Sequence, residues 1–162
     1  MNNRIGDNLV HFSANEELVR ALSDAGVKFV VVGGLAVAWY CPERQADDMD
    51  LLVEPTAENS ERIARALANL RIAGFFPESF ARHGLQVPLK HIFYAELLTP
   101  QEDAPTFSEI EAGAADAKLF NIPVRLASVS ALIEMKKRAV RSAPEQQEKH
   151  LKDIALLENN DA

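Results

Sequence analysis

Cysteine is nearly absent from this chain, since Cys41 is the single example among 162 residues. One cysteine excludes an internal disulfide, so a reducing compartment such as the cytoplasm is expected, with Cys41 as a small packed residue. Long apolar runs are absent too. No run of about 18 apolar residues occurs, and the N-terminal segment lacks an apolar core of signal-peptide length. We therefore expect no membrane span.

Positive charge is also scarce. The chain has 17 Lys and Arg against 24 Asp and Glu, a formal net charge of -7, which argues against nonspecific binding to nucleic acid or to an anionic membrane. Repeats, low-complexity segments and glycine-serine linkers are missing as well. The composition, 48% hydrophobic and 25% charged, is that of a globular protein. We expect one domain over residues 1–162, with a core at about 14–105 and a C-terminal strand and helix pair at about 106–160.

The most informative segment begins with a strand predicted at 27–32, which ends at Gly33 and Gly34. A helix is predicted to start directly from this diglycine and to cover 35–40. Glycine leaves backbone N–H groups accessible, and the start of a helix favours anions. Alone, the pair is explained equally well by a tight turn; beside the acidic residues that follow, it indicates phosphate binding.

Those acidic residues are Asp48 and Asp50, on a strand predicted at 48–53. Residues two apart on a strand emerge on one face about 6.6 Å from each other. Mg²⁺ prefers oxygen ligands, so the pair can share one ion or bridge two. The opposite face is apolar and is expected to be buried: Met49, Leu51 and Val53. Asp47 shares that parity at the strand entrance and is interpreted as solvated.

The rest of the chain alternates helices and strands. Helices are predicted at 14–25, 56–70, 128–142 and 145–159, and Pro144 separates the last two. Strands are predicted at 85–89 and 91–98, with one or two further short strands within 106–126. Loops are predicted at 71–84 and 100–105. This alternation predicts an α/β or α+β domain with a mixed sheet.

The penultimate helix carries one residue against its pattern. At 100° per residue its apolar residues share one arc, and Lys136 lies in the middle of that arc. An inward lysine is costly unless its ammonium has a partner or reaches solvent. The basic residues on the other arc, Lys137, Arg138 and Arg141, are interpreted as a solvated face. In the last helix, His150 and Leu151 are predicted to face inward.

The segment 33–53 of the chain resembles the nucleotidyltransferase superfamily typified by DNA polymerase beta. The resemblance lies in two glycines, thirteen intervening residues and then the run DMDLLV, which Arg44 precedes. The similarity is greater to its small bacterial branch, with lincosamide-type antibiotic nucleotidyltransferases and abortive-infection toxins. HIFYAELLTP places Glu96 where this family usually has a third aspartate. The family's closing helix pair is resembled by two C-terminal segments, LASVSALIEMKKRAV and EKHLKDIALLE. Ala46 departs from the family's usual threonine or serine.

The resemblance implies a polymerase beta-like fold and transfer of a nucleoside monophosphate from a nucleoside triphosphate to an acceptor hydroxyl, with loss of pyrophosphate. Two Mg²⁺ ions are expected on Asp48, Asp50 and Glu96, with Glu96 also accepting the hydroxyl proton. Nucleotide binding is expected at four further positions: Gly33, Gly34, Arg44 and Lys136. Lys136 would then pair with a carboxylate of the site or with the phosphates.

The acceptor stays open between a small molecule, a protein hydroxyl and the 3′ end of transfer RNA. One alternative is a degenerate protein of this fold that binds nucleotide or a partner protein without turnover. Another is a toxin-antitoxin protein that depends on a partner. A protein partner or homo-oligomer is consistent with either alternative, and pyrophosphate release separates an enzyme from a binding protein.

Overall fold

A computed structural model describes residues 15–46, 48–89, 93–142, 145 and 147–160. Helices and strands alternate along the chain as predicted. The helices are α1 (Asn15–Asp24), α2 (Gly33–Tyr40), α3 (Ala57–Asn69), α4 (Phe107–Ala112), α5 (Val129–Ser142) and α6 (Gln147–Asn160). The strands are β1 (Phe29–Val32), β2 (Met49–Val53), β3 (Gln86–Pro88), β4 (Ala95–Leu98), β5 (Ala115–Leu119) and β6 (Ile122–Leu126).

The strands form one mixed six-stranded sheet in the order β3-β4-β2-β1-β6-β5. At its centre β1 is antiparallel to β2 and parallel to β6, while β2 is parallel to β4. The predicted α/β class with a mixed sheet is therefore confirmed. The central strands bury apolar residues on both faces, as β1 does along its whole length, because helices cover the sheet.

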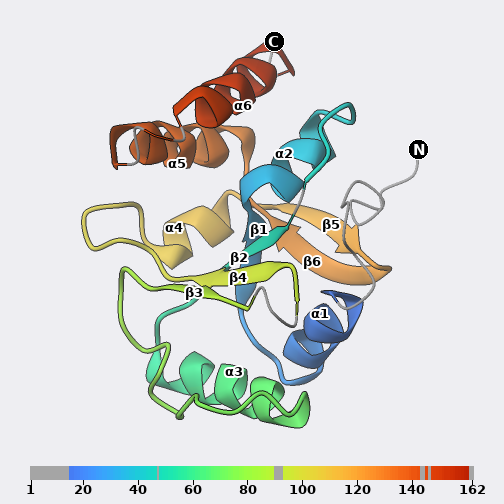
Figure 1. The fold of residues 1–162 in the computed structure, drawn as a ribbon, viewed down its shortest axis with the longest axis vertical. Helices are drawn as coiled ribbons and strands as arrows, with labels where there is room; N and C mark the ends of the chain where they lie inside the picture. Colours follow the sequence, from blue (N-terminus) through green and yellow to red (C-terminus); the bar gives the residue numbers. More distant parts are fainter. Residues whose placement is uncertain (1–14, 47, 90–92, 143–144, 146, 161–162) are drawn as a thin grey trace.

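The helices divide between two sides of the sheet. Figure 1 shows α1 and α3 near the base of the molecule, and α2, α5 and α6 gathered at the opposite end. The predicted C-terminal helix pair is present, with α6 packed along α5 and both in contact with α2. No helix among the described residues is long and apolar enough to cross a membrane.

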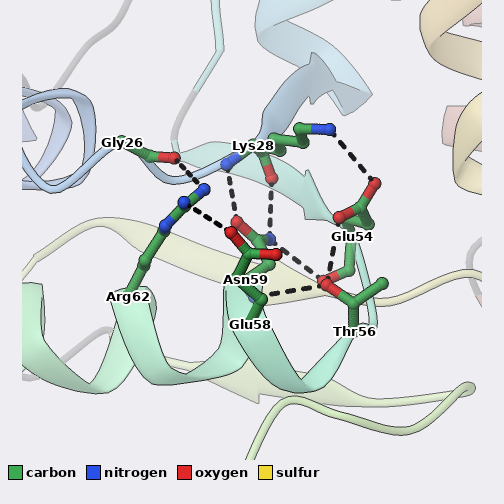
Figure 2. A network of polar contacts seen from close by, with 7 residues as sticks. All are labelled: Gly26, Lys28, Glu54, Thr56, Glu58, Asn59 and Arg62. Carbon is green, nitrogen blue, oxygen red and sulfur yellow. Dashed lines mark hydrogen bonds and ion pairs between the residues drawn. The ribbon is translucent and has the colours of Figure 1, made fainter.

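A polar network fixes the end of the sheet remote from the diglycine (Figure 2). Asn59, 1% exposed in α3, accepts a hydrogen bond from the Lys28 backbone N–H and donates to the carbonyls of Lys28 and Glu54. The Thr56 hydroxyl caps α3 by accepting from the Asn59 N–H, as predicted. Because Lys28 precedes β1 and Glu54 follows β2, Asn59 holds the two central strands in register.

One helix was not predicted, and one predicted orientation is wrong. The segment 106–126 contains a helix, α4, before its two strands, and the Thr106 hydroxyl caps this helix. The helix was not predicted because six residues are too few to show a helical period. Leu151, predicted to face inward, is 47% exposed, because the buried side of α6 is formed by Asp153, Ile154 and Leu157. Asp47 and Pro144 lie outside the described residues.

Candidate active site

The diglycine lies at the junction of β1 and α2, where its geometry requires glycine. Gly33 has φ of +70°, and a Cβ there would lie 2.3 Å from Oδ2 of Asp50. Both the backbone conformation and the carboxylate exclude a larger residue. A Cβ at Gly34 would meet the Arg44 guanidinium at 2.8 Å. Val32, the N-cap of α2, makes no side-chain capping bond, so the helix begins without a side-chain cap.

The predicted carboxylates come together through strand register. Asp50 in β2 is the neighbour of Val32 in β1 on one side and of Glu96 in β4 on the other. Asp48 immediately precedes β2, and the predicted apolar face behind it is fully buried: Met49, Leu51 and Val53. Glu96 therefore lies on the strand next to the one that carries Asp50.

The electrostatics show that these three acids interact. Burial raises the pKa of Asp50 to about 6, and the negative charges of Asp48 and Glu96 add to that rise. Lys136 and Lys149 act in the opposite direction. Two like charges close by disfavour ionisation, and a nearby cation reverses this effect. The cluster thus concentrates negative charge that a cation would neutralise.

No group of three or more His, Cys, Asp or Glu side chains among the described residues is gathered closely enough to hold a metal ion. Asp48 and Glu96 act on Asp50 through their charges.

A second charged cluster borders the first. Asp153 of α6, 2% exposed, pairs with Nε of Arg44 at 2.9 Å and with Nζ of Lys136 at 3.0 Å. Arg44 also donates from Nη1 to the carbonyl of Gln45. One carboxylate thus binds a cation from the α2–β2 loop and a cation from α5. This contact joins the C-terminal helix pair to the diglycine end of the sheet.

The pKa of Asp153 reflects both its burial and its partners. Burial alone would raise this pKa, but the hydrogen bond from Arg44 and the charge of Lys136 outweigh it, so the net shift is downward. The pKa of half-buried His150 is lowered by burial and by the charges of Lys136 and Lys149, with Asp153 opposing them. The cluster keeps Asp153 ionised.

The inward position of Lys136 is confirmed, since the residue is 7% exposed. Its direct partner is Asp153, whereas we expected one of the three site carboxylates or a phosphate. Lys136 still acts on Asp50 through its charge. Asp153 was not predicted as a site residue. Its position four residues before the buried Leu157 places both on one side of the helix, so the pattern could have predicted a buried aspartate.

A cavity of about 680 Å³ opens beside this second cluster. Its lining combines basic and acidic residues of α6 with Arg44 and Asp153. Lys149, which acts on the pKa of Asp50, lies on its wall. The cavity therefore adjoins the second charged cluster.

No protein-family model matches this chain, and no curated protein matches it either. Solved structures do match. The crystal structure of ANT(2″)-Ia in complex with adenylyl-2″-tobramycin has a TM-score of 0.58 and 18% identity, over 88% of this chain and 84% of that one.

Two further structures agree. The solution structure of the antibiotic-resistance factor ANT(2″)-Ia has a TM-score of 0.60 and 17% identity, covering 90% of this chain and 80% of that one. An antigenic nucleotidyltransferase-like protein from Paracoccidioides brasiliensis has a TM-score of 0.56 and 16% identity, covering 89% and 74%. The chain therefore has the polymerase beta-like nucleotidyltransferase fold.

Proposed function

We propose that this protein is a Mg²⁺-dependent nucleotidyltransferase that moves a nucleoside monophosphate from a nucleoside triphosphate to an acceptor hydroxyl. The observation that carries the proposal is the register that sets Asp50 beside Glu96, against the Gly33 start of α2. The carboxylates that would bind a cation and the helix N-terminus that would bind phosphates then lie at the same end of the central strands.

Asp48, Asp50 and Glu96 are the residues that would hold Mg²⁺. Burial is the main cause of the raised pKa of Asp50, and the charges of Asp48 and Glu96 add to it. A divalent ion would relieve the part that comes from these like charges, so the three carboxylates fit a cation. Bound Mg²⁺ neutralises phosphate charge during phosphoryl transfer. The backbone N–H groups at Gly33 and Gly34 would hold the β and γ phosphates.

The remaining residues act on the acceptor and on developing charge. Glu96 would accept the proton of the acceptor hydroxyl as that oxygen attacks the α-phosphorus and the bond to the β-bridging oxygen breaks. Pyrophosphate then leaves. The ammonium of Lys136 has three N–H donors, so its pair with Asp153 leaves donors to meet phosphate oxygens. Asp153 would be a positioning residue that holds Lys136 and Arg44 at the site.

The decisive experiment incubates the protein with each labelled triphosphate, Mg²⁺ and whole-cell extract, followed by identification of the labelled product. We expect label from at least one triphosphate, Mg²⁺-dependent pyrophosphate release, and neither with a variant that carries Asp48→Asn and Asp50→Asn. Nucleotide binding without label or pyrophosphate, under every condition, would make this a binding protein with the nucleotidyltransferase fold.

A further inference from the structure

A second cavity, of about 720 Å³, lies between α5 and the ends of strands β2 and β4, and we call it the α5 cavity. The loop that follows β4, residues 99–105, closes one side, and Figure 1 shows this segment running below α5 toward α4. Apolar residues form much of its wall: Leu52, Leu85, Leu98, Ile110, Met135 and Ala139.

The α5 cavity lies on the sheet face that carries the carboxylates. Leu52 is two residues beyond Asp50 on β2 and Leu98 is two beyond Glu96 on β4, so each shares its acid's face. The same register that pairs Asp50 with Glu96 pairs Leu52 with Leu98. The cavity floor thus begins about 6.6 Å along the strands from the acids. The acids do not line the cavity, so a molecule seated there would have to extend over this distance to present a group to Glu96.

The charge of the α5 cavity is opposite to that of the whole chain. Its charged lining residues are Arg138, Arg141 and Asp103, two cations against one anion, whereas the chain carries a formal charge of -7. Gln86, Thr99, Gln101 and Ser142 add neutral polar groups. This lining favours an anionic ligand and disfavours a polycation.

Arg138 is held by one short hydrogen bond and two long ion pairs. Its Nη2 donates to the backbone carbonyl of Asp103 at 2.7 Å. Its ion pairs, with the Asp103 carboxylate and with Glu134, are both 3.5 Å long, and the Asp103 side chain is 86% exposed. Long, exposed pairs are weak. Nε is buried and makes no hydrogen bond. The guanidinium is therefore positioned to exchange these contacts for a ligand anion.

We propose that the α5 cavity binds the acceptor, and that the acceptor is a small hydroxyl compound with an apolar body and an anionic group. The body would lie on Leu52 and Leu98, the anion against Arg138 and Arg141, and the hydroxyl toward Glu96. This proposal rests on the proposed transferase function. The proposed acceptor is an anion, whereas a polyamino sugar is a cation.

The test compares three probes with one skeleton and different charge: para-hydroxyphenylacetate, its amide, and tyramine. Each is titrated into isotope-labelled full-length protein without nucleotide, with backbone amide shifts as the readout. We expect the carboxylate to bind at least about 10-fold more tightly than tyramine, with the amide between them. The shifts should centre on residues around Leu52, Leu98 and 135–142.

Variants link the charge preference to the α5 cavity. Arg138→Gln, which removes the charge and keeps a polar side chain, should weaken carboxylate binding about 10-fold and leave the amide unchanged. Lys137→Gln is the matched control, because this exposed neighbour does not line the cavity. Ala139→Phe should fill the cavity and block all three probes. It serves as a second variant if Arg138→Gln fails to fold.

Equal binding of the three probes, binding of none, shifts confined to α6, or insensitivity to both variants would overturn the assignment. The test needs no turnover, so it fails separately from the proposed function. The Asp48→Asn, Asp50→Asn variant should still bind the carboxylate probe. Charge-selective binding without nucleotidyl transfer would overturn the transferase function alone, and transfer without charge-selective binding would overturn the acceptor class alone.

Discussion

Asp50 and Asp153 are carboxylates of neighbouring clusters whose pKa values are shifted in opposite directions. Asp50 shares its surroundings with Asp48 and Glu96, and its pKa rises to about 6. Asp153 lies between Arg44 and Lys136, and its pKa falls. Burial raises the pKa of both, so the sign of the nearby charges accounts for the difference. The first cluster combines buried and like-charged carboxylates, whereas the second pairs its carboxylate with two cations and joins α6 to the diglycine end of the sheet.

The largest expected effect comes from removing the acidic cluster. A variant with Asp48→Asn and Asp50→Asn should lose Mg²⁺-dependent triphosphate binding, since it loses two of three proposed ligands. Its melting temperature should stay equal or rise by about 2 to 4 °C, because like-charge repulsion is relieved. Calorimetric titration of Mg-nucleotide and a thermal melt check both parts. Unchanged affinity would remove these aspartates from the metal site.

The next effect separates rate from binding. Glu96→Gln should lower turnover by about 10² or more and change nucleotide affinity only modestly, because the group is proposed to act on the attacking hydroxyl. Turnover is measured as pyrophosphate release, and affinity by titration. Equal turnover in variant and parent would place the third carboxylate elsewhere.

Lys136→Met tests the second cluster through stability. The change leaves buried Asp153 with Arg44 as its remaining partner in the ion-pair cluster, so we expect a loss of about 3 kcal/mol in the free energy of unfolding. Urea denaturation measures it. The neighbouring exposed residue offers the control, since Lys137→Met should change stability by less than about 0.5 kcal/mol. An equal effect at both positions would contradict a buried pair.

The smallest effect is a pH dependence from Asp153. A carboxylate with a folded pKa below its ordinary value of 3.8 contributes stability that is complete above that value. The contribution is lost as the pH falls below 3.8 and through the lower folded pKa. Asp153→Asn should therefore flatten the acid limb of a plot of unfolding free energy against pH. Parallel acid limbs in variant and parent would show that Asp153 is not stabilised in the folded state.

Local patterns predicted the elements that build the site. The β1–diglycine–α2 junction, the buried face behind Asp48 and Asp50, and the cap at Thr56 all depend on neighbours within a few residues. Lys136 was predicted to face inward for the same reason, because helical periodicity is a local property. The short helix α4 was missed since its six residues are too few to show a period.

The amino-acid sequence by itself determined which chemical groups this protein has and the spacing at which they recur along strands and helices, since side-chain direction repeats every two or 3.6 residues. Tertiary structure decided which groups meet. Arg44 and Asp153 are 109 residues apart, and no local period predicts their contact. The register of β2 with β4 likewise places Glu96 beside Asp50 and joins Leu52 to Leu98 in the floor of the α5 cavity. Such pairings depend on how all the elements pack at once, so only the folded chain determines them.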